Sequence, residues 1–458
     1  MSDQHLSVVI LAAGQGTRMK SSLPKVLHPI GGKPLLQHVI NTAYDLSARQ
    51  IVVVYGHGGD QVQQTLANEK VSWVEQAQQL GTGHAVAQTT EHLDNDHIVL
   101  VLYGDVPLIN ATTLADLVKQ ASNDRLALLT VHLDDPHGYG RIVRNKQGHV
   151  QRIVEQKDAS EDELAISEIN TGILAVSASR LKDWLARLKN DNAQGEYYLT
   201  DIIEMAVGDG VEVVAAHPAS EDEVLGVNSR SQLAYLERVY QQQQAQLLMA
   251  QGVTVMDPAR LDIRGTVNIA SDVTLDVNVV LEGDVTIEKD VYIGPGCVIR
   301  NSVIGRGVQM QAMCVVDQAQ VGPDCLLGPY SRLRPGAELV GDNHVGNFVE
   351  IKNSVIGQGS KVNHLTYIGD TDMGSGVNIG AGTITANYDG ANKHRTTIED
   401  NASTGSNSVL VAPVKVGKGA TIGAGSVVTR EAPADKLTVC RARQVTVDGW
   451  RRPTKKKS

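Results

Sequence analysis

Aromatic residues are scarce in this sequence. They make up 3% of the 458 residues, and Phe348 is the single phenylalanine, whereas glycine occurs 44 times. A β-sandwich with an aromatic-rich core is therefore not expected. Few aromatic residues and many glycines are typical of a solenoid, whose narrow interior takes β-branched side chains and whose corners take glycine.

Cysteine is also rare. The four cysteines, Cys297, Cys314, Cys325 and Cys440, all lie in the second half of the chain and show no C-x-x-C spacing. Zinc ligation and a disulfide framework are therefore not expected. We expect reduced thiols, with Cys297 in a small slot of the repeat described below.

Long apolar runs are missing, since no stretch of about 18 apolar residues occurs and no charged segment precedes a short apolar one at the N-terminus. The sequence predicts neither membrane insertion nor secretion, and we expect a cytoplasmic location. The formal net charge of -10 argues against a nucleic-acid partner, which would need a coherent basic face. The one dense basic run, Arg451 to Lys457, is either a solvated terminus or a contact for a phosphorylated ligand.

The strongest pattern in the chain is an apolar residue at every sixth position from about residue 260. Short flat strands joined by tight turns follow from this period, and three strands per coil close a triangular prism. Residues 387–394 interrupt the period, and an excursion from so regular a scaffold indicates a functional loop. The first run of the period comprises Ile263, Ile269, Leu275, Leu281, Ile287, Ile293 and Ile299, and the last comprises Ile398, Thr404, Leu410, Val416, Ile422 and Val428.

The first 230 residues follow a different pattern. Apolar runs at 8–11, 51–54, 98–102 and 126–131 are separated by helical patterns such as 35–44 and 112–120. This alternation predicts a Rossmann-like, mostly parallel sheet with helices on both faces, which binds ligands at the carboxyl ends of its strands. We therefore predict an α/β domain over residues 1–230, a linker helix over 231–251, and a hexapeptide-repeat domain over 252–458 that ends in the basic tail.

A glycine-rich turn follows the apolar run at 8–11 and is the first candidate site. In Leu11-Ala12-Ala13-Gly14-Gln15-Gly16-Thr17-Arg18, free backbone N–H groups can bind nucleotide phosphates. The turn lacks the Gly-Lys-Ser/Thr ending of a Walker loop and the third glycine of a dinucleotide fingerprint. Arg18 and Lys25 are the nearby cations. Taken alone, the pattern is equally compatible with a plain turn.

Asp105 closes the motif Tyr103-Gly104-Asp105, at the carboxyl end of the apolar run at 98–102. A carboxylate there suits Mg²⁺, which takes one or two protein oxygens and fills its other positions with phosphate and water. The alternative is a helix N-cap or a turn aspartate.

These motifs belong to a longer series in a fixed order, and on that series the chain resembles a known family. Over nearly its whole length it is similar to the bacterial bifunctional N-acetylglucosamine-1-phosphate uridylyltransferases and glucosamine-1-phosphate acetyltransferases. The motifs are Leu11 to Arg18, Pro24-Lys25, Gln76, Leu80-Gly81-Thr82-Gly83-His84, Gly104-Asp105, Gly138-Tyr139-Gly140-Arg141, Glu155, Asn170-Thr171-Gly172 and Gly226-Val227-Asn228.

The resemblance implies an α/β nucleotidyltransferase domain followed by a left-handed parallel β-helix of hexapeptide repeats, in a homotrimer. It also implies Mg²⁺ as cofactor and UTP, acetyl-CoA, glucosamine 1-phosphate and N-acetylglucosamine 1-phosphate as substrates. A sugar-phosphate oxygen would attack the α-phosphorus of UTP, with no protein nucleophile, because such a step needs positioning and charge neutralisation.

In the first domain the resemblance implies four groups of ligand contacts. The nucleotide phosphates would contact Leu11, Ala12, Ala13, Gly14, Arg18 and Lys25, with Tyr103 and Gly104 in the same site. The uracil would contact Gln76, Gly81 and Thr82, and Mg²⁺ would bind Asp105 and Asn228. The sugar would contact Gly140, Glu155 and Asn170.

His364 is the candidate base of the second domain. It lies beside a position of the six-residue period and not in it, so its side chain should point outward. A neutral imidazole can take the proton of an amine that attacks an acyl group, and the alternative is a surface histidine without a role. Its setting favours a site, since the polar groups expected near it are Arg332, Arg334, Lys352 and Tyr367.

The resemblance implies acetyl transfer from acetyl-CoA to the amine of glucosamine 1-phosphate, with His364 as general base. A backbone N–H or Tyr388 would stabilise the oxyanion. The acceptor sugar would be held by Arg334, Lys352, Tyr367 and Asn378, and the coenzyme by Ala381, Asn387, Tyr388, Ser406, Ala424 and Arg441.

Two stretches depart from the family pattern. Ala386 stands where members often carry cysteine, which argues against a thiol nucleophile, and residues 401–406 are polar where members usually show an apolar run. Two competing hypotheses stay open at this point. One is a single-activity sugar nucleotidyltransferase whose hexad domain is structural or regulatory, and the other is a non-catalytic scaffold.

Overall fold

The computed structural model describes residues 5–56 and 58–455. Its contacts divide the chain into two compact units, Met1–Tyr240 and Gln241–Ser458. The division falls inside the long helix α8 (Arg230–Ala250), where the sequence predicts a linker helix. The domain bounds given above stay a prediction. Among the described residues, no helix combines the length and the apolar character that crossing a membrane requires.

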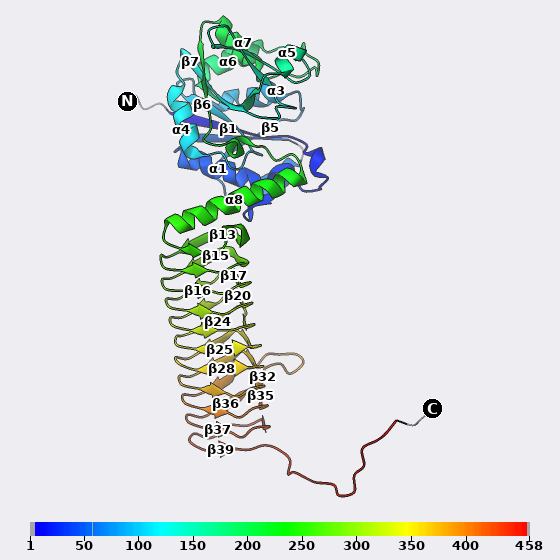
Figure 1. Ribbon diagram of the computed structural model, residues 1–458, viewed down its shortest axis with the longest axis vertical. Coiled ribbons are helices and arrows are strands. Elements are labelled where there is room, and N and C mark those ends of the chain that lie inside the picture. The colour runs from blue at the N-terminus through cyan, green and yellow to red at the C-terminus, as the bar shows by residue number, and fades with distance from the viewer. Residues whose placement is uncertain (1–4, 57, 456–458) are drawn as a thin grey trace. The chain divides into compact units, whose positions relative to one another are not determined.

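The first unit is built on one twisted sheet (Figure 1). Strand β10 runs antiparallel to both of its neighbours in the sheet, β7 and β6, and the remaining pairings along the row are parallel. The mostly parallel sheet is therefore confirmed. In sheet order the strands are β11 (Glu212–Ala216), β7 (Arg125–His132), β10 (Glu168–Ser177), β6 (Ile98–Tyr103), β1 (Leu6–Ala12), β4 (Gln50–Tyr55) and β5 (Ser72–Glu75); the hairpin β8 (Arg141–Arg144) and β9 (Val150–Val154) pairs with β10, and β2 (Pro29–Ile30) pairs with β3 (Lys33–Pro34).

Helices cover both faces of this sheet. Val8 and Ile10 of β1 pack in one apolar cluster with α1 and α4, whereas Val9 and Leu11 pack in another with α3, α6 and α7. Since successive side chains of a strand point to opposite faces, β1 is buried along its whole length. The described helices before α8 are α1 (Leu35–Asp45), α2 (Gly59–Thr65), α3 (Thr82–Ala87), α4 (Ala111–Gln120), α5 (Glu161–Leu164), α6 (Ala178–Arg187) and α7 (Asp201–Gly208).

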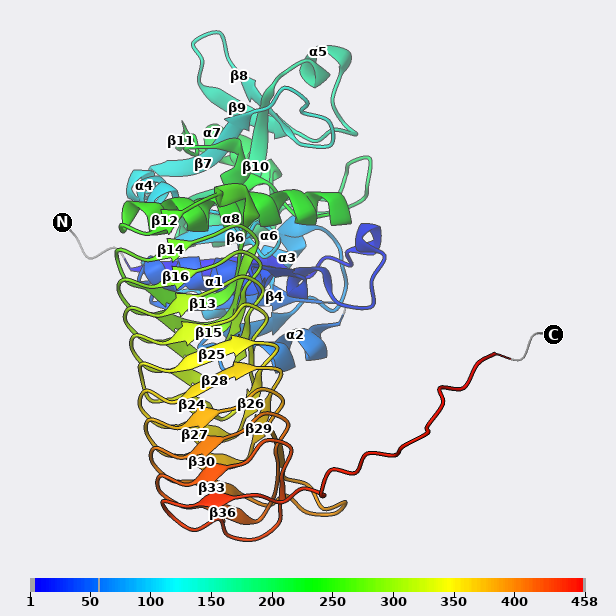
Figure 2. The same ribbon diagram turned by 60° about the horizontal axis from the view of Figure 1, so that its bottom comes forward.

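The second unit is a stack of coils whose strands pair in parallel with the coil before and the coil after (Figures 1 and 2). A typical coil has three strands, which confirms the prediction of three strands per turn. One strand of each coil joins a sheet made of β12 (Thr254–Val255), β14 (Thr274–Leu275), β16 (Tyr292–Ile293), β19 (Gln309–Met310), β22 (Leu326–Leu327), β25 (His344–Asn347), β28 (Lys361–His364), β31 (Asn378–Ile379), β34 (Ser403–Thr404), β37 (Thr421–Ile422) and β39 (Leu437–Thr438).

The other strands of the coils form a longer sheet. Its members are β13 (Leu261–Ile269), β15 (Val279–Ile287), β17 (Val298–Arg300), β18 (Val303–Ile304), β20 (Val315–Asp317), β21 (Gln320–Val321), β23 (Arg332–Leu333), β24 (Ala337–Leu339), β26 (Glu350–Lys352), β27 (Ser354–Ile356), β29 (Tyr367–Gly369), β30 (Thr371–Met373), β32 (Ile384–Ala386), β33 (Thr396–Ile398), β35 (Val409–Val411), β36 (Val414–Val416) and β38 (Val427–Val428).

The six-residue period fills the interior of the stack, and Ile263, Ile293 and Val428 are each buried. Cys297 occupies such a slot, and all four cysteines are free thiols. Thr404 keeps the period although it is polar, because its buried hydroxyl accepts a hydrogen bond from the Gly380 N–H (3.0 Å) and pairs with the Thr383 hydroxyl (3.1 Å). The period alone therefore identifies the core of this unit.

One loop leaves the stack after β32, over residues 387–394 (Figure 1). It folds on itself, since the Asp389 carboxylate accepts the N–H groups of Ala391 (2.8 Å) and Asn392 (2.7 Å) and lies 2.7 Å from His394 Nε2. The excursion predicted from the break in the period is thus an ordered hairpin turn. At the other end of the unit, Cys440 to Lys455 form no helix or strand and are exposed, and Lys456 and Lys457 of the basic run lie outside the described residues.

Candidate active sites

A cleft of about 280 Å³ opens at the carboxyl ends of β1 and β6 in the first unit. This is where a parallel sheet binds ligands. Ten of the residues predicted for the nucleotide line it: Leu11, Ala12, Ala13, Gly14, Lys25, Gln76, Gly81, Thr82, Tyr103 and Asp105. Sequence reasoning missed four further lining residues, Val26, Gln79, Ala85 and Glu196.

The glycine turn packs closely against its surroundings. Gly16 has a φ of 63°, and a Cβ there would come within 2.7 Å of the Lys25 Cβ. Gly104 donates its N–H to the Leu11 carbonyl (2.9 Å), and a Cβ on it would lie 3.3 Å from the Ala12 Cβ. Gly16 is therefore packed against the segment that carries Lys25, and the end of β1 is held to the end of β6. Arg18 lies on the exposed side of this turn and does not line the cleft.

Lys25, Asp105 and Asn228 meet at the end of β6. The Lys25 ammonium contacts the Asp105 carboxylate and lies 3.1 Å from the Asn228 carboxamide oxygen. The Val227 N–H donates to the Asp105 carbonyl (2.8 Å), which holds the two segments together. One carboxylate and one amide oxygen thus point at a common cation. This donor set suits Mg²⁺, which needs few protein oxygens.

The residues predicted to contact uracil lie together on the other side of the cleft. The buried Gln76 side chain donates to the Gly81 carbonyl (3.0 Å), and the Thr82 hydroxyl accepts the Leu199 N–H (3.2 Å). Gly81 has a φ of 110° and a Cβ there would lie 2.6 Å from the Tyr197 carbonyl, so only glycine fits. Gln79 donates to the Ala13 carbonyl (2.5 Å) and so joins this side to the glycine turn.

The three residues predicted to contact the sugar form a second group. Asn170 donates its N–H to the Gly140 carbonyl (2.9 Å), and a Cβ on Gly140 would lie 3.5 Å from the Glu155 carboxylate. Burial raises the pKa of Glu155, and the charges of Asp158 and Glu196 act in the same direction, although a hydrogen bond from Thr200 (3.1 Å) opposes them. Thr200 is another residue that sequence reasoning missed.

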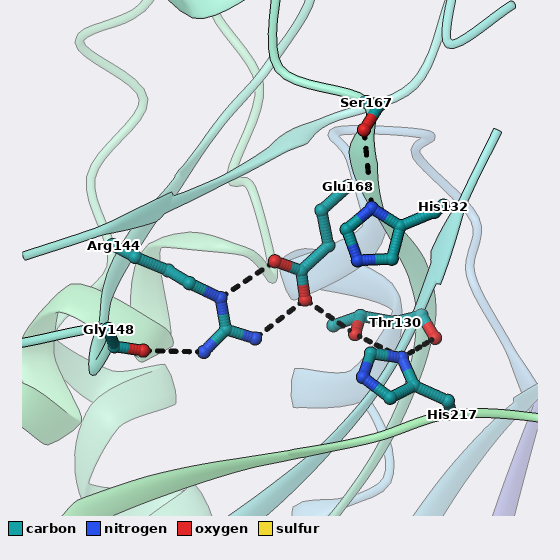
Figure 3. Close-up of polar contacts among 7 residues, drawn as sticks. All are labelled: Thr130, His132, Arg144, Gly148, Ser167, Glu168 and His217. Carbon is teal, nitrogen blue, oxygen red and sulfur yellow. Dashed lines mark hydrogen bonds and ion pairs between the residues drawn. The ribbon is translucent and has the colours of Figure 1, made fainter. Parts of the chain in front are cut away.

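A polar network braces the hairpin that carries Gly140 and Glu155 at its two ends (Figure 3). Arg144, the last residue of β8, donates to Glu168 through Nε (2.7 Å) and Nη2 (2.6 Å), and the Thr130 hydroxyl donates to the same carboxylate (2.8 Å). His217 Nδ1 lies 3.0 Å from the Thr130 carbonyl. Since Glu168 is buried, this network links the hairpin to β7 and β10 from inside the protein.

Replacing Glu168 with glutamine should lower the free energy of unfolding of the first unit by about 2 kcal/mol at neutral pH. Burial would raise the pKa of Glu168, but the hydrogen bonds from Arg144 and Thr130 and the charge of Arg144 lower it overall. A depressed pKa means that the stabilisation is complete above about pH 4.3, the value for a free glutamate, and is lost as pH falls further. The difference between wild type and variant should therefore shrink in acid.

Urea unfolding followed by the fluorescence of Trp184, which is fully buried in this unit, measures the effect. Glu212→Gln is the matched control because Glu212 pairs with Arg125 (2.9 Å) on the same sheet, but both side chains are largely exposed. Such a pair contributes little to stability, so the control should unfold like wild type. Equal effects of the two substitutions would contradict the bracing role.

In the second unit, His364 ends strand β28 and is exposed. Its Nδ1 lies 3.0 Å from the side-chain oxygen of Asn347, the residue opposite it in the preceding coil. An amide oxygen only accepts hydrogen bonds, so Nδ1 carries the proton and Nε2 keeps a free lone pair. The outward direction predicted for this histidine is confirmed, and Nε2 is the atom that can act as a base.

Residues predicted for the coenzyme lie in one column with His364. Each stands at the same corner of a successive coil, since the Gly382 N–H donates to the His364 carbonyl (3.1 Å), the Asn407 N–H to the Ala381 carbonyl (2.7 Å), and the Gly425 N–H to the Ser406 carbonyl (2.8 Å). Arg441 donates to the Ala424 carbonyl (3.0 Å) at the end of the column. The column therefore joins His364, Ala381, Ser406, Ala424 and Arg441.

The predicted acceptor residues come mainly from the other sheet. Arg334 donates to Glu350 (2.8 Å), and Tyr367 lies opposite Glu350 in the next coil. Lys352 lies close to Lys393 of loop 387–394, and contact with the Lys352 ammonium lowers the pKa of Lys393. Sequence reasoning missed Lys393, because only the folded loop brings it to Lys352.

The remaining predicted residues lie at two places. Asn378 pairs with Lys361, which is at the opposite end of β28 from His364. Asn387 is buried at the base of the loop, where its amide lies 3.5 Å from the Tyr367 hydroxyl. Tyr388 is exposed and donates its hydroxyl to the Gly390 carbonyl (2.6 Å). Within one chain, Asn387 therefore lies beside Tyr367. Asn378 does not lie opposite His364, because it pairs with the other end of β28.

Two family descriptions match the chain. Residues 8–255 match the MobA-like NTP transferase domain. Residues 266–301 and 395–430 match the six-repeat bacterial transferase hexapeptide. The two matches fall on the two architectures described above.

Curated relatives cover the whole chain. It is 58% identical to the bifunctional protein GlmU of Ralstonia pickettii over 452 residues, which are 99% of both chains. It is 55% identical to the bifunctional protein GlmU of Acinetobacter baumannii strain AYE, over 98% of this chain and 99% of the relative. Among solved structures, a UDP-glucose pyrophosphorylase complexed with UDP-glucose is 17% identical over 52% of this chain and 98% of that one, with a TM-score of 0.43.

Proposed function

Because the chain belongs to the family of bifunctional GlmU proteins, we propose that its two units carry separate active sites that act in succession. The protein is a bifunctional transferase that makes UDP-N-acetylglucosamine. Acetyl-CoA acetylates glucosamine 1-phosphate, and UTP then uridylylates the N-acetylglucosamine 1-phosphate with release of pyrophosphate. The observation that carries the site assignment is the cleft of the first unit, which ten predicted nucleotide residues line.

In the first unit, the glycine turn binds the triphosphate through backbone N–H groups and Lys25 neutralises its charge. Gln76, Gly81 and Thr82 contact the uracil, and the hairpin residue Glu155 contacts the sugar. Asp105 and Asn228 would hold Mg²⁺, which supplies positive charge to the phosphates when bound. The protein itself aligns the sugar-phosphate oxygen with the α-phosphorus, so no side chain forms a covalent intermediate.

In the second unit, His364 Nε2 takes the proton as the amine of glucosamine 1-phosphate attacks the acetyl thioester. The hydrogen bond to Asn347 keeps the imidazole in the tautomer that can accept it. The column that runs from Ala381 to Arg441 binds the coenzyme. Arg334, Lys352 and Tyr367 bind the acceptor, and a backbone N–H or the Tyr388 hydroxyl stabilises the oxyanion.

We also propose that the second site is completed by neighbouring copies of the chain. Asn378 is assigned to the acceptor, yet its strand register separates it from His364 within one chain. This separation supports a homotrimer in which another subunit supplies Asn378. We also propose a cytoplasmic location, which is supported by the four free thiols.

Assays of both half-reactions on the purified chain test the proposal. We expect CoA release from acetyl-CoA that depends on glucosamine 1-phosphate, and pyrophosphate release from UTP that depends on N-acetylglucosamine 1-phosphate and Mg²⁺. Light scattering of the same preparation should give three times the mass of one chain. Release of pyrophosphate without any release of CoA would contradict the proposal and would show that the protein is a single-activity nucleotidyltransferase.

A further inference from the structure

A buried carboxylate lies beside the acetyl-transfer site and has no part in the assignments above. Asp370 directly follows β29 and is 5% exposed. Its carboxylate accepts hydrogen bonds from the side-chain amides of Asn387 and Asn353. Burying a charge is costly unless it is hydrogen-bonded and compensated by other charges. The presence of an aspartate at this position therefore requires a reason.

Backbone geometry does not supply that reason. Asp370 stands at a left-handed corner with φ of 49°, and uncharged residues occupy the same corner in earlier coils, with φ of 45° at Asn353, 48° at Gln318 and 43° at Asn301. Its N–H donates to the Lys352 carbonyl (3.1 Å), as each of these corners does to the coil before it. Asparagine tolerates this conformation at least as well as aspartate. The corner does not need a charge.

The amides and charges around Asp370 account for it. Burial would raise the pKa of Asp370, but its two amide hydrogen bonds and the charges of Lys352 and Lys393 lower it overall. Asp370 is thus a buried negative charge that two amide hydrogen bonds and the charges of the two lysines stabilise. It also holds Asn387, the residue at which loop 387–394 begins.

We propose that Asp370 is a positioning residue for acetyl transfer, which orients the Asn387 amide at the start of loop 387–394. The inference rests on the proposed acetyl transfer at His364. Because the carboxylate already holds the amide, Asn387 does not have to be oriented when the substrates bind.

Asp370→Asn tests the proposal. The carboxylate accepts from two amides, whereas an asparagine offers one accepting oxygen and turns its NH₂ group toward the other amide. The carboxylate network that holds Asn387 is therefore broken, because either Asn353 or Asn387 must turn or lose its partner. We expect kcat for acetyl transfer to fall about 10- to 100-fold. The KM for glucosamine 1-phosphate should not rise, because both ammonium groups remain and one opposing charge is gone. Steady-state CoA release measures the two constants.

Asp372→Asn is the matched control. Asp372 lies two residues away, is exposed, and binds Arg395 just beyond the loop (2.8 Å), so the substitution removes the same charge without touching Asn387. It should leave both constants within about twofold of wild type. Uridylyl transfer of Asp370→Asn should match wild type, because its site belongs to the other unit. The thermal midpoint should fall, because the interactions that lower the pKa of Asp370 stabilise the folded state, but the variant should still fold, since Asn301 and Asn353 occupy the same corner.

Two outcomes would overturn the positioning role. One is an unchanged kcat in Asp370→Asn, and the other is a KM that rises as kcat falls, which is the signature of a loop that has simply come loose. Absence of CoA release in wild type would instead contradict the acetyl transfer on which the inference rests. The kinetic constants of Asp370→Asn therefore test the positioning role, and CoA release by the wild type tests the acetyl transfer separately.

Discussion

Replacing Asp105 with alanine should lower kcat/KM for uridylyl transfer by at least about 100-fold and leave acetyl transfer unchanged. Asp105 supplies the carboxylate of the Mg²⁺ site and contacts Lys25, so its loss removes both a ligand and the group that fixes a phosphate-binding cation. The His364 site belongs to the other unit and should not respond. Pyrophosphate release and CoA release, measured on the same preparation, give the two rates.

Asp116→Ala serves as the control for this variant. Asp116 is an exposed aspartate of the same unit, on α4, and pairs with Lys119 (2.8 Å) one turn away. Its loss should change neither rate. An Asp105→Ala protein that makes UDP-N-acetylglucosamine at the wild-type rate would remove Asp105 from the site. A loss of both rates would point to misfolding, and Asp105→Asn, which keeps the size of the side chain, would then decide.

Replacing His364 with alanine should suppress acetyl transfer by about 100-fold or more, which is the range expected when a general base is lost. Uridylyl transfer should be unaffected. Asn347→Ala should have a smaller effect in the same direction, because it removes only the hydrogen bond that fixes the imidazole tautomer. CoA release in the presence of glucosamine 1-phosphate measures each variant.

His344→Ala is the control for the histidine substitution. His344 begins β25, the same strand that carries Asn347, and lies opposite Lys361 and not opposite His364. Acetyl transfer should persist in this variant. If acetyl transfer also persisted in His364→Ala, another group would have to take the proton of the amine.

The sequence was most informative where a period or a turn fixes the backbone. The six-residue spacing predicts which side chains fill the stack, even at Thr404, because each short strand turns the same position of its hexad inward. The glycine turn and Asp105 lie together because the ends of neighbouring parallel strands meet at one edge of a sheet. The family resemblance supplied the predicted roles of the site residues. The bifunctional relatives that span the chain exclude the two alternative hypotheses, a single-activity nucleotidyltransferase and a non-catalytic scaffold.

Contacts between distant segments could not be predicted in this way. Lys393 reaches Lys352 only because Asp389 folds the loop back on itself. Thr200 reaches Glu155, and Arg144 reaches Glu168, across segments whose spacing in sequence carries no signal. The antiparallel direction of β10 also could not be predicted from its composition, because an apolar strand can have the same residues whether it runs parallel or antiparallel to its neighbours. Such contacts depend on tertiary packing, which local patterns do not encode.

The coil that carries loop 387–394 closes again without any disturbance to its neighbours. Thr371 pairs with Thr396 and Met373 with Ile398 directly beyond the loop, and the following coil pairs Ile398 with Val416 as if nothing had been added. Extra residues at a corner cost little when the ladder on both sides is intact. The loop therefore adds a folded segment to the surface at one corner and leaves the interior of the stack unchanged. Because each coil pairs with its neighbours alone, a change at one corner stays local.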